Sequence, residues 1–211
     1  MKVVAKIIVF RHTETTDNRD KIFSGWRDVD LTEKGIKDAE EIGEKLKNEK
    51  VTKAYASDQL RSRRTLEIVL KHHSNVHLQQ DPRIKDRNFG DLTGTPDTVP
   101  VVVDPRIKER DYGDLTGKSK AKTAKEFPKD YPIWHRAYDV PPPGGESIRD
   151  VEKRVVSFLD DLIQTLRKDD VIFISAHGNS IRPMRKYFEG LNNEEMATFE
   201  HEPGKIYSYE T

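Results

Sequence analysis

Two histidines each follow an apolar run, at the point where a buried strand would end. Residues 3–10 lead into Arg11 and His12, and residues 171–176 lead into His177. Continuous β-branched runs are typical of strands buried on both faces of a parallel sheet, and ligands of such sheets bind at the carboxyl ends of the strands. If these strands are neighbours, two imidazoles and a guanidinium meet at one edge. The alternative is two unrelated histidines at strand ends.

These residue types suit a small phosphorylated substrate. The planar guanidinium of Arg11 can hold two phosphate oxygens, and a neutral His12 can attack phosphorus to form a phosphohistidine. Stabilising the equatorial oxygens is the main task in phosphoryl transfer, and the leaving oxygen also needs a proton. Glu109 is the candidate acid, with an ordinary surface charge as its alternative. Arg61 is either a further phosphate ligand or a solvated helix cation.

Length and composition exclude several classes of protein. A chain of 211 residues is expected to form one domain over residues 1–211. Because 37 basic residues balance 37 acidic ones, net charge favours neither nucleic acid nor a membrane as a partner. The chain has no cysteine, which excludes disulfides and is compatible with the cytoplasm. No stretch is long enough to span a bilayer, residues 1–2 lead directly into a strand rather than a signal peptide, and the histidines lack zinc-ligand spacing. We therefore expect no metal.

Strands alternate with helices along the chain. This order predicts an α/β three-layer sandwich, with a mostly parallel central sheet flanked by helices. Besides the two strands above, the expected elements are a helix capped by Thr32, a strand over 53–57, a basic helix from Asp58, a helix over 147–166 that begins with a capping box of Ser147 and Asp150, a helix over 180–189 and an edge strand over 205–209.

One segment of the chain occurs twice. Residues 81–94 return as residues 104–117, at an offset of 23 residues and with 11 of 14 positions identical. Two copies are too few to bury the faces of a solenoid. We therefore interpret the repeat as a local tandem duplication, in which about 75–97 duplicates 98–120.

The second copy carries the better chemistry. Asp86 of the first copy is one methylene shorter than Glu109, and a misplacement of about 1 Å costs roughly 10²-fold in rate. Phe89 lacks the hydroxyl of Tyr112. We expect the second copy in the native position and 75–97 extruded as a flexible insertion, because doubling a loop costs only about 0.6 kcal/mol. Exchange between the copies and pairing of the first copy with a neighbouring chain, as in a homodimer, are the alternatives.

An ordered set of motifs resembles a known family. Arg11-His12-Thr13-Glu14-Thr15 is similar to the signature of the histidine phosphatase superfamily. The chain most resembles the 2,3-bisphosphoglycerate-dependent phosphoglycerate mutases of that superfamily. The further matches are Asn18, Ser24-Gly25-Trp26, Ser57 with Arg61, Glu109 to Gly117 with Lys120, residues 134–136, residues 138–143 and residues 177–180. Each match alone is weak, but their order covers nearly the whole chain outside one repeat copy.

The resemblance implies a phosphoglycerate mutase-like fold and a phosphohistidine mechanism. It implies that His12 is the phosphorylated nucleophile, that Arg11, Arg61 and His177 bind the transferring phosphoryl group, and that Glu109 is the general acid and base. The residues implied to position phosphoglycerate are Asn18, Ser24, Gly25, Tyr112, Lys120, Arg136, Gly178 and Asn179. The implied reaction interconverts 3- and 2-phosphoglycerate, with 2,3-bisphosphoglycerate as the priming cofactor and no metal.

Four departures from the family pattern leave other functions open. Thr13 stands where the family has glycine, and His135 replaces the first of two arginines. The proline run continues directly into Gly144, without the long excursion and the C-terminal tail of dimeric mutases. The repeat is the fourth departure. The alternatives are a histidine phosphatase that hydrolyses small phosphomonoesters, and a weakly active or scaffold variant obstructed by the inserted repeat.

Overall fold

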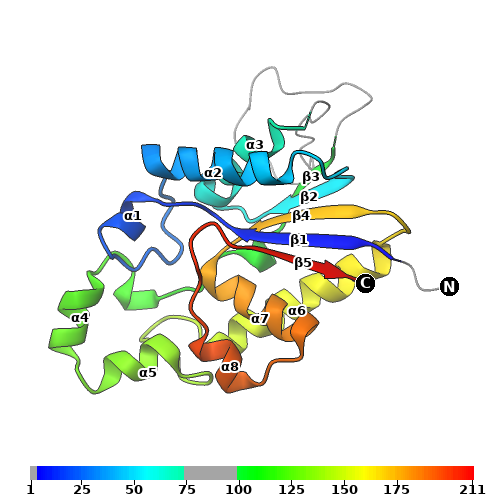
Figure 1. Ribbon diagram of the computed structural model, residues 1–211. Helices are drawn as coiled ribbons and strands as arrows, with labels where there is room; N and C mark the ends of the chain where they lie inside the picture. The colour runs from blue at the N-terminus through cyan, green and yellow to red at the C-terminus, as the bar shows by residue number, and fades with distance from the viewer. Residues whose placement is uncertain (1–3, 74–98) are drawn as a thin grey trace.

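The computed structural model describes residues 4–73 and 99–211, and within them five strands form one sheet (Figure 1). In the order β3-β2-β4-β1-β5, the strands are β1 (Lys6–Arg11), β2 (Lys53–Ala56), β3 (Val101–Val103), β4 (Val171–Ala176) and β5 (Ile206–Glu210). The first four run parallel, and the edge strand β5 is antiparallel to β1. The mostly parallel sheet predicted from the sequence is confirmed.

Helices cover both faces of the sheet (Figure 1). On one face lie α2 (Glu33–Leu46) and α3 (Leu60–Leu70), and on the other α6 (Ile148–Thr165) and α7 (Gly178–Glu189). The shorter elements are α1 (Thr16–Arg19), α4 (Lys120–Glu126), α5 (Asp130–Arg136), α8 (Asn193–Thr198) and the 3₁₀ turns η1 (Pro105–Ile107) and η2 (Gly113–Leu115). The predicted three-layer sandwich is therefore confirmed.

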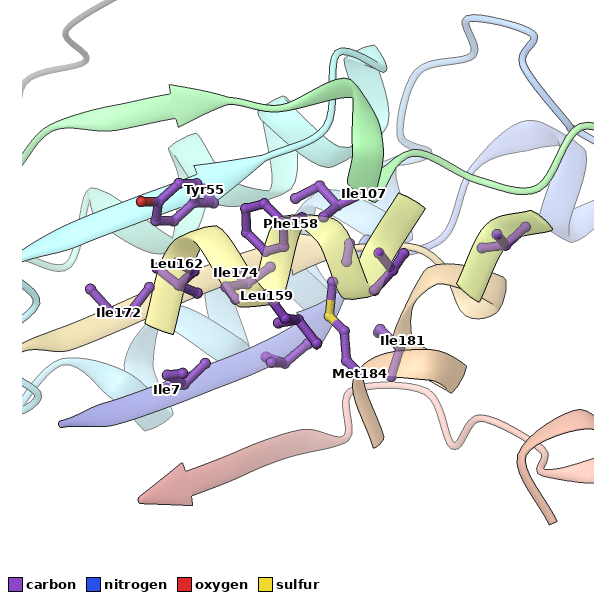
Figure 2. Packing of buried hydrophobic residues seen from close by; sticks show 14 residues of the cluster. Ile7, Tyr55, Ile107, Phe158, Leu159, Leu162, Ile172, Ile174, Ile181 and Met184 are labelled. Atoms are coloured by element: carbon purple, nitrogen blue, oxygen red, sulfur yellow. The ribbon is translucent and has the colours of Figure 1, made fainter. Parts of the chain in front are cut away.

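Strand β1 divides its buried side chains between the two helical layers. Ile7 and Val9 belong to the cluster formed with α6 and α7, whereas Ile8 and Phe10 belong to the cluster formed with α2 and α3. Figure 2 shows Phe158 and its neighbours on α6 packed over the strands. Because both faces of the strand are buried, its sequence is a continuous apolar run rather than an alternating one.

The helix starts follow the predicted caps. The Thr32 hydroxyl accepts a hydrogen bond from Gly35 N at 3.0 Å. Ser147 and Asp150 form the predicted capping box, in which each side chain accepts from the other residue's backbone N–H at 3.1 Å. Such caps satisfy N–H groups that the first helical turn leaves without partners. They fix where the helices begin, and therefore where the preceding loops end.

Strands β1 and β4 are adjacent, as the shared site requires. Arg11 lies opposite Ala176 in the register, and His12 N donates to the Ala176 carbonyl at 2.9 Å. His177 follows directly as the N-cap residue of α7. Both histidines therefore leave the sheet at the same edge.

Part of the second repeat copy lies at the other edge of the sheet. Val101 pairs with Ala54 of β2, and Ile107 is fully buried in the cluster with α6. Tyr112 and Leu115 pack on Phe23. These contacts place residues 99–120 in the sheet and its adjoining loops. The predicted extrusion of 75–97 lies outside the described residues.

Candidate active site

A pocket of about 640 Å³, open solvent included, lies where β1 and β4 end. The predicted residues that line it are Arg11, His12, Asn18, Ser24, Gly25, Arg61, Glu109, Tyr112, Lys120, Arg136, Gly178 and Asn179. His177 is fully buried behind this lining, with its ring centroid 5.0 Å from that of His12. The structure thus brings all the predicted site residues together, at the sheet edge expected for a ligand.

The orientation of His12 is fixed by its own backbone. Its Nδ1 lies 2.8 Å from the Thr13 carbonyl oxygen. Because a carbonyl can only accept, Nδ1 carries the proton, and Nε2 keeps its lone pair. Burial, followed by the charges of Arg11 and Arg61, holds the pKa of His12 well below its usual value. The ring is therefore neutral at pH 7, as a nitrogen nucleophile must be.

His177 is held from the opposite side. Its Nε2 lies 2.6 Å from the Ser57 hydroxyl, whereas its buried Nδ1 has no hydrogen-bond partner among the described residues. Burial and the charge of Arg61 lower the pKa of His177 well below its usual value. The neutral ring is thus fixed next to His12, and His177 N donates to the Ser180 hydroxyl at 3.0 Å at the start of α7.

Arg61 is a fully buried residue and not the solvated helix cation that its position on α3 also allowed. Its guanidinium donates to the Arg27 carbonyl at 2.8 Å and to the Gly25 carbonyl at 3.0 Å, while its Nε has no partner among the described residues. Two backbone carbonyls thus fix the guanidinium plane, and Arg61 lines the pocket together with His12.

Glu109 is buried, and its two oxygens are in different environments. Oε1 accepts from Arg110 N at 2.7 Å, from Asn179 Nδ2 at 2.9 Å and from Asn179 N at 3.2 Å. Burial raises its pKa, but these donors and the charges of Arg61 and Arg11 outweigh burial, so the net pKa is lowered. Because three donors occupy Oε1, a proton taken up by the carboxylate binds at Oε2.

Three residues outside the predicted set of site residues position Glu109. Arg154 of α6 donates to the carbonyls of Arg106, Lys108 and Glu109 at 2.7, 2.8 and 3.0 Å. Gln59 Oε1 accepts from Glu109 N at 2.8 Å, and Gln59 Nε2 donates to the Gly25 carbonyl at 2.9 Å. Trp26 Nε1 donates to the Glu109 carbonyl at 2.9 Å. The acid is therefore fixed through its main chain.

Thr13 and His135 show what two of the departures do. Thr13 does not add to the pocket lining; its N–H donates to the Thr65 hydroxyl at 3.2 Å. His135 does line the pocket, stacked on Tyr131 at 5.2 Å between ring centroids. Burial, with the charges of Arg136 and Lys120, lowers the pKa of His135 to about 4. A neutral ring therefore stands at this position.

The pocket also contains residues that were not predicted. They are Ile22, Phe23, Arg182, Glu200 and His201. Arg182 lies one helical turn after Gly178 on α7, so i,i+4 spacing from a predicted residue could have indicated it. His201 lies between α8 and β5, and its Nε2 is 2.5 Å from the Gly178 carbonyl oxygen. No periodicity marks a side chain on such a loop.

Buried neutral histidines make stability depend on pH. Besides His12 and His177, burial and nearby arginines lower the pKa of His201 to about 4. The unfolded chain takes up protons near pH 6.5 and the folded chain does not, so the free energy of unfolding is expected to fall as the pH drops below that value. Between pH 8 and pH 6, above the range of carboxylates, each such histidine contributes up to about 0.8 kcal/mol.

Urea unfolding at the two pH values checks this expectation. His135 is a further histidine whose pKa is lowered by burial. In the His135→Asn variant, the free energy of unfolding is therefore expected to change less between pH 8 and pH 6 than in the parent chain. Equal free energies of unfolding at pH 8 and pH 6 would contradict it.

The described residues contain neither a metal-binding cluster nor a membrane-spanning helix. Residues 4–73 and 99–211 contain no group of three or more His, Cys, Asp or Glu placed to hold a metal ion. No helix in the same ranges has the length and apolar character needed to cross a membrane.

Comparisons with known proteins agree with the motifs. The model of the histidine phosphatase superfamily (branch 1) matches residues 7–99 and 95–211, and each range includes one repeat copy. A 2,3-bisphosphoglycerate-dependent phosphoglycerate mutase of Chlamydia caviae is 33% identical over 98% of this chain and 93% of its own. A protein of the same name from Methanococcus vannielii is 34% identical over 93% of this chain and 86% of its own.

Solved structures share the fold at lower identity. YhfR of Bacillus stearothermophilus superposes with a TM-score of 0.77 at 22% identity, covering 97% of this chain and 90% of its own. A mycobacterial glucosyl-3-phosphoglycerate phosphatase has a TM-score of 0.78 at 21% identity, covering 97% and 92%. The relatives found by sequence are thus named as mutases, whereas this structural neighbour is named as a phosphatase.

Proposed function

The chain belongs to the histidine phosphatase superfamily, and on that basis we propose that it is a cytoplasmic 2,3-bisphosphoglycerate-dependent phosphoglycerate mutase. The observation that carries the proposal is the position of His12 and Glu109 in one pocket with Lys120 and Arg136. The first two residues supply a nucleophile and a proton donor. The other two supply positive charge for a second anionic group, which phosphoglycerate has and a simple phosphomonoester lacks.

The transferring phosphoryl group would bind among the cations that line the pocket beside His12. Arg11 and Arg61 are both in that lining, and two backbone carbonyls hold the guanidinium of Arg61 in place. Preorganised donors of this kind stabilise the charge on phosphoryl oxygens in the transition state. The same donors, with Lys120 and Arg136, would hold 2,3-bisphosphoglycerate, which when bound supplies the phosphoryl group that primes His12.

Glu109 takes up one proton in one half-reaction and gives it back in the other. Starting from the phosphoenzyme, the hydroxyl oxygen of the substrate attacks phosphorus, the N–P bond breaks, and the Glu109 carboxylate takes up the hydroxyl proton at Oε2. In the other half-reaction His12 Nε2 forms a bond to phosphorus, the bond from phosphorus to the other substrate oxygen breaks, and Glu109 returns this proton to the leaving oxygen. The Thr13 carbonyl accepts the Nδ1 proton of His12 throughout, which stabilises positive charge on the ring.

A phosphatase is the second candidate, and a specific observation favours it. His135 stands at a position where an arginine would bind the second anionic group of the substrate, and its ring is neutral. Weaker binding of a second anionic group would favour substrates with a single phosphate. It would also let water reach the phosphohistidine.

One assay separates the candidates. The protein is incubated with 2,3-bisphosphoglycerate and 3-phosphoglycerate, and both 2-phosphoglycerate and free phosphate are measured. We expect 2-phosphoglycerate to form in large excess over phosphate. Phosphate without isomerisation would favour the phosphatase, and the absence of both products would contradict both enzymes.

A further inference from the structure

Two carboxylates line the described pocket, and the mechanism above uses only Glu109. The other, Glu200, follows the C-terminal end of α8. Its Oε1 accepts a hydrogen bond from Nη2 of Arg136, and the two side chains form an ion pair. An acidic group that faces an anion-binding pocket opposes the binding of anions, so its presence needs an explanation.

The cations that line the pocket differ in the groups to which they are already hydrogen-bonded. Arg61 is fixed beside His12 by the Gly25 and Arg27 carbonyls. Arg182, also in the lining, donates to the Met196 and Ala197 carbonyls at 2.9 and 3.0 Å, so its guanidinium is held by α8.

Lys120 and Arg136 are the cations brought to the pocket by α4 and α5. Lys120 Nζ lies 5.5 Å from the centroid of the Phe23 ring. The guanidinium of Arg136 is the one paired with a carboxylate. A second anionic group on a ligand would therefore compete with Glu200 for Arg136.

The exposure of the two side chains makes that competition reversible. The Glu200 side chain is 75% exposed, whereas that of Arg136 is 27% exposed. Glu200 can turn into water and be solvated there, while Arg136 stays in the pocket wall. A partly exposed ion pair of this kind contributes up to about 1 kcal/mol, which corresponds to about fivefold in an equilibrium constant.

We propose that Glu200 sets the specificity of the pocket for the second functional group of the substrate. By occupying Arg136, it lowers the affinity for phosphomonoesters that carry a further anion, relative to those with a neutral group in the same place. The inference rests on the proposed function only in that it takes this pocket as the phosphomonoester site. It makes Glu200 a determinant of which phosphomonoester is bound, without a role in the transfer step.

The test compares two ligands of nearly equal size in two variants. Calorimetry measures the Kd of 3-phosphoglycerate, which has a carboxylate, and of glycerol 3-phosphate, which has a hydroxymethyl group instead. In Glu200→Gln the preference for 3-phosphoglycerate is expected to rise about fivefold, because the amide keeps the shape and loses the charge. Glu202→Gln, which removes a carboxylate lying 3.8 Å from Lys205 and outside the pocket lining, is expected to leave the preference unchanged.

Each outcome decides something. An unchanged or reduced preference in Glu200→Gln, or an equal rise in Glu202→Gln, would overturn the role of Glu200. Because the readout is binding, absence of 2-phosphoglycerate formation would count against the mutase while the shift in preference still supported this inference. Failure of both ligands to bind any variant would overturn both proposals.

Discussion

Replacing His12 with alanine is expected to abolish the phosphoenzyme and to lower kcat by at least about 10⁴-fold, for isomerisation and for phosphate release alike. The imidazole is the group that forms a bond to phosphorus, and the Thr13 carbonyl fixes its Nδ1 proton so that Nε2 keeps the attacking lone pair. Rapid quenching and detection of acid-labile protein-bound phosphate measure the first effect, and steady-state assays measure the second.

A second histidine serves as the matched control. His72 lies just after α3, with Nδ1 3.6 Å from the Glu44 carboxylate, and it does not line the pocket. The variant His72→Ala is expected to keep parental activity. If His12→Ala retained activity within tenfold of the parent, phosphohistidine chemistry at this residue would be wrong.

The variant Glu109→Gln is expected to lose about 10²- to 10⁴-fold in kcat with 3-phosphoglycerate, the usual size of a general acid–base contribution. The amide keeps an oxygen that accepts from Arg110 and Asn179, but its NH₂ group can neither give up nor take up a proton as a carboxyl group does. With p-nitrophenyl phosphate, whose leaving group departs without protonation, the same variant is expected to form the phosphoenzyme at nearly the parental rate.

The leaving-group comparison separates proton transfer from electrostatics. An equal loss with both substrates would mean that Glu109 contributes charge rather than a proton. The variant Glu109→Asp reproduces the acid of the first repeat copy, Asp86, and is expected to fall about 10²-fold because the carboxyl is withdrawn by one methylene. If Glu109→Asp kept parental activity, the shorter side chain of Asp86 would no longer be a reason to expect the second copy, rather than the first, at the site.

The framework of the site was predictable because burial leaves a strong pattern. The runs that became β1 and β4 each contain four consecutive apolar residues, since both faces of these strands pack on helices. Capping residues such as Thr32 mark helix starts by a local hydrogen bond. Local patterns of this kind depend only on neighbouring residues, and they predicted the two strands that precede His12 and His177. The adjacency of these strands was a condition of the prediction, and the structure supplies it.

Other parts of the site depend on contacts that leave no local pattern. The side chain of Arg154 reaches backbone carbonyls of a loop far away in the sequence, and any residue type offers a carbonyl. Helix α5, which carries His135 and Arg136, has no buried residue and therefore no apolar stripe to predict it. Glu200 lies on a loop, where its pairing depends on how α5 and α8 pack.

The strand order has a consequence for how the protein is made. Strand β1 pairs with β4 and β5, and its partners are the last two strands to be synthesised. At a synthesis rate of roughly 5–20 residues per second, β1 would be made on the order of 10 to 30 seconds before β4. During that interval the strand that leads into His12 lacks both of its partners in the sheet. A nascent chain stalled before residue 171 is therefore expected to be aggregation-prone and catalytically silent, whatever the state of its other segments.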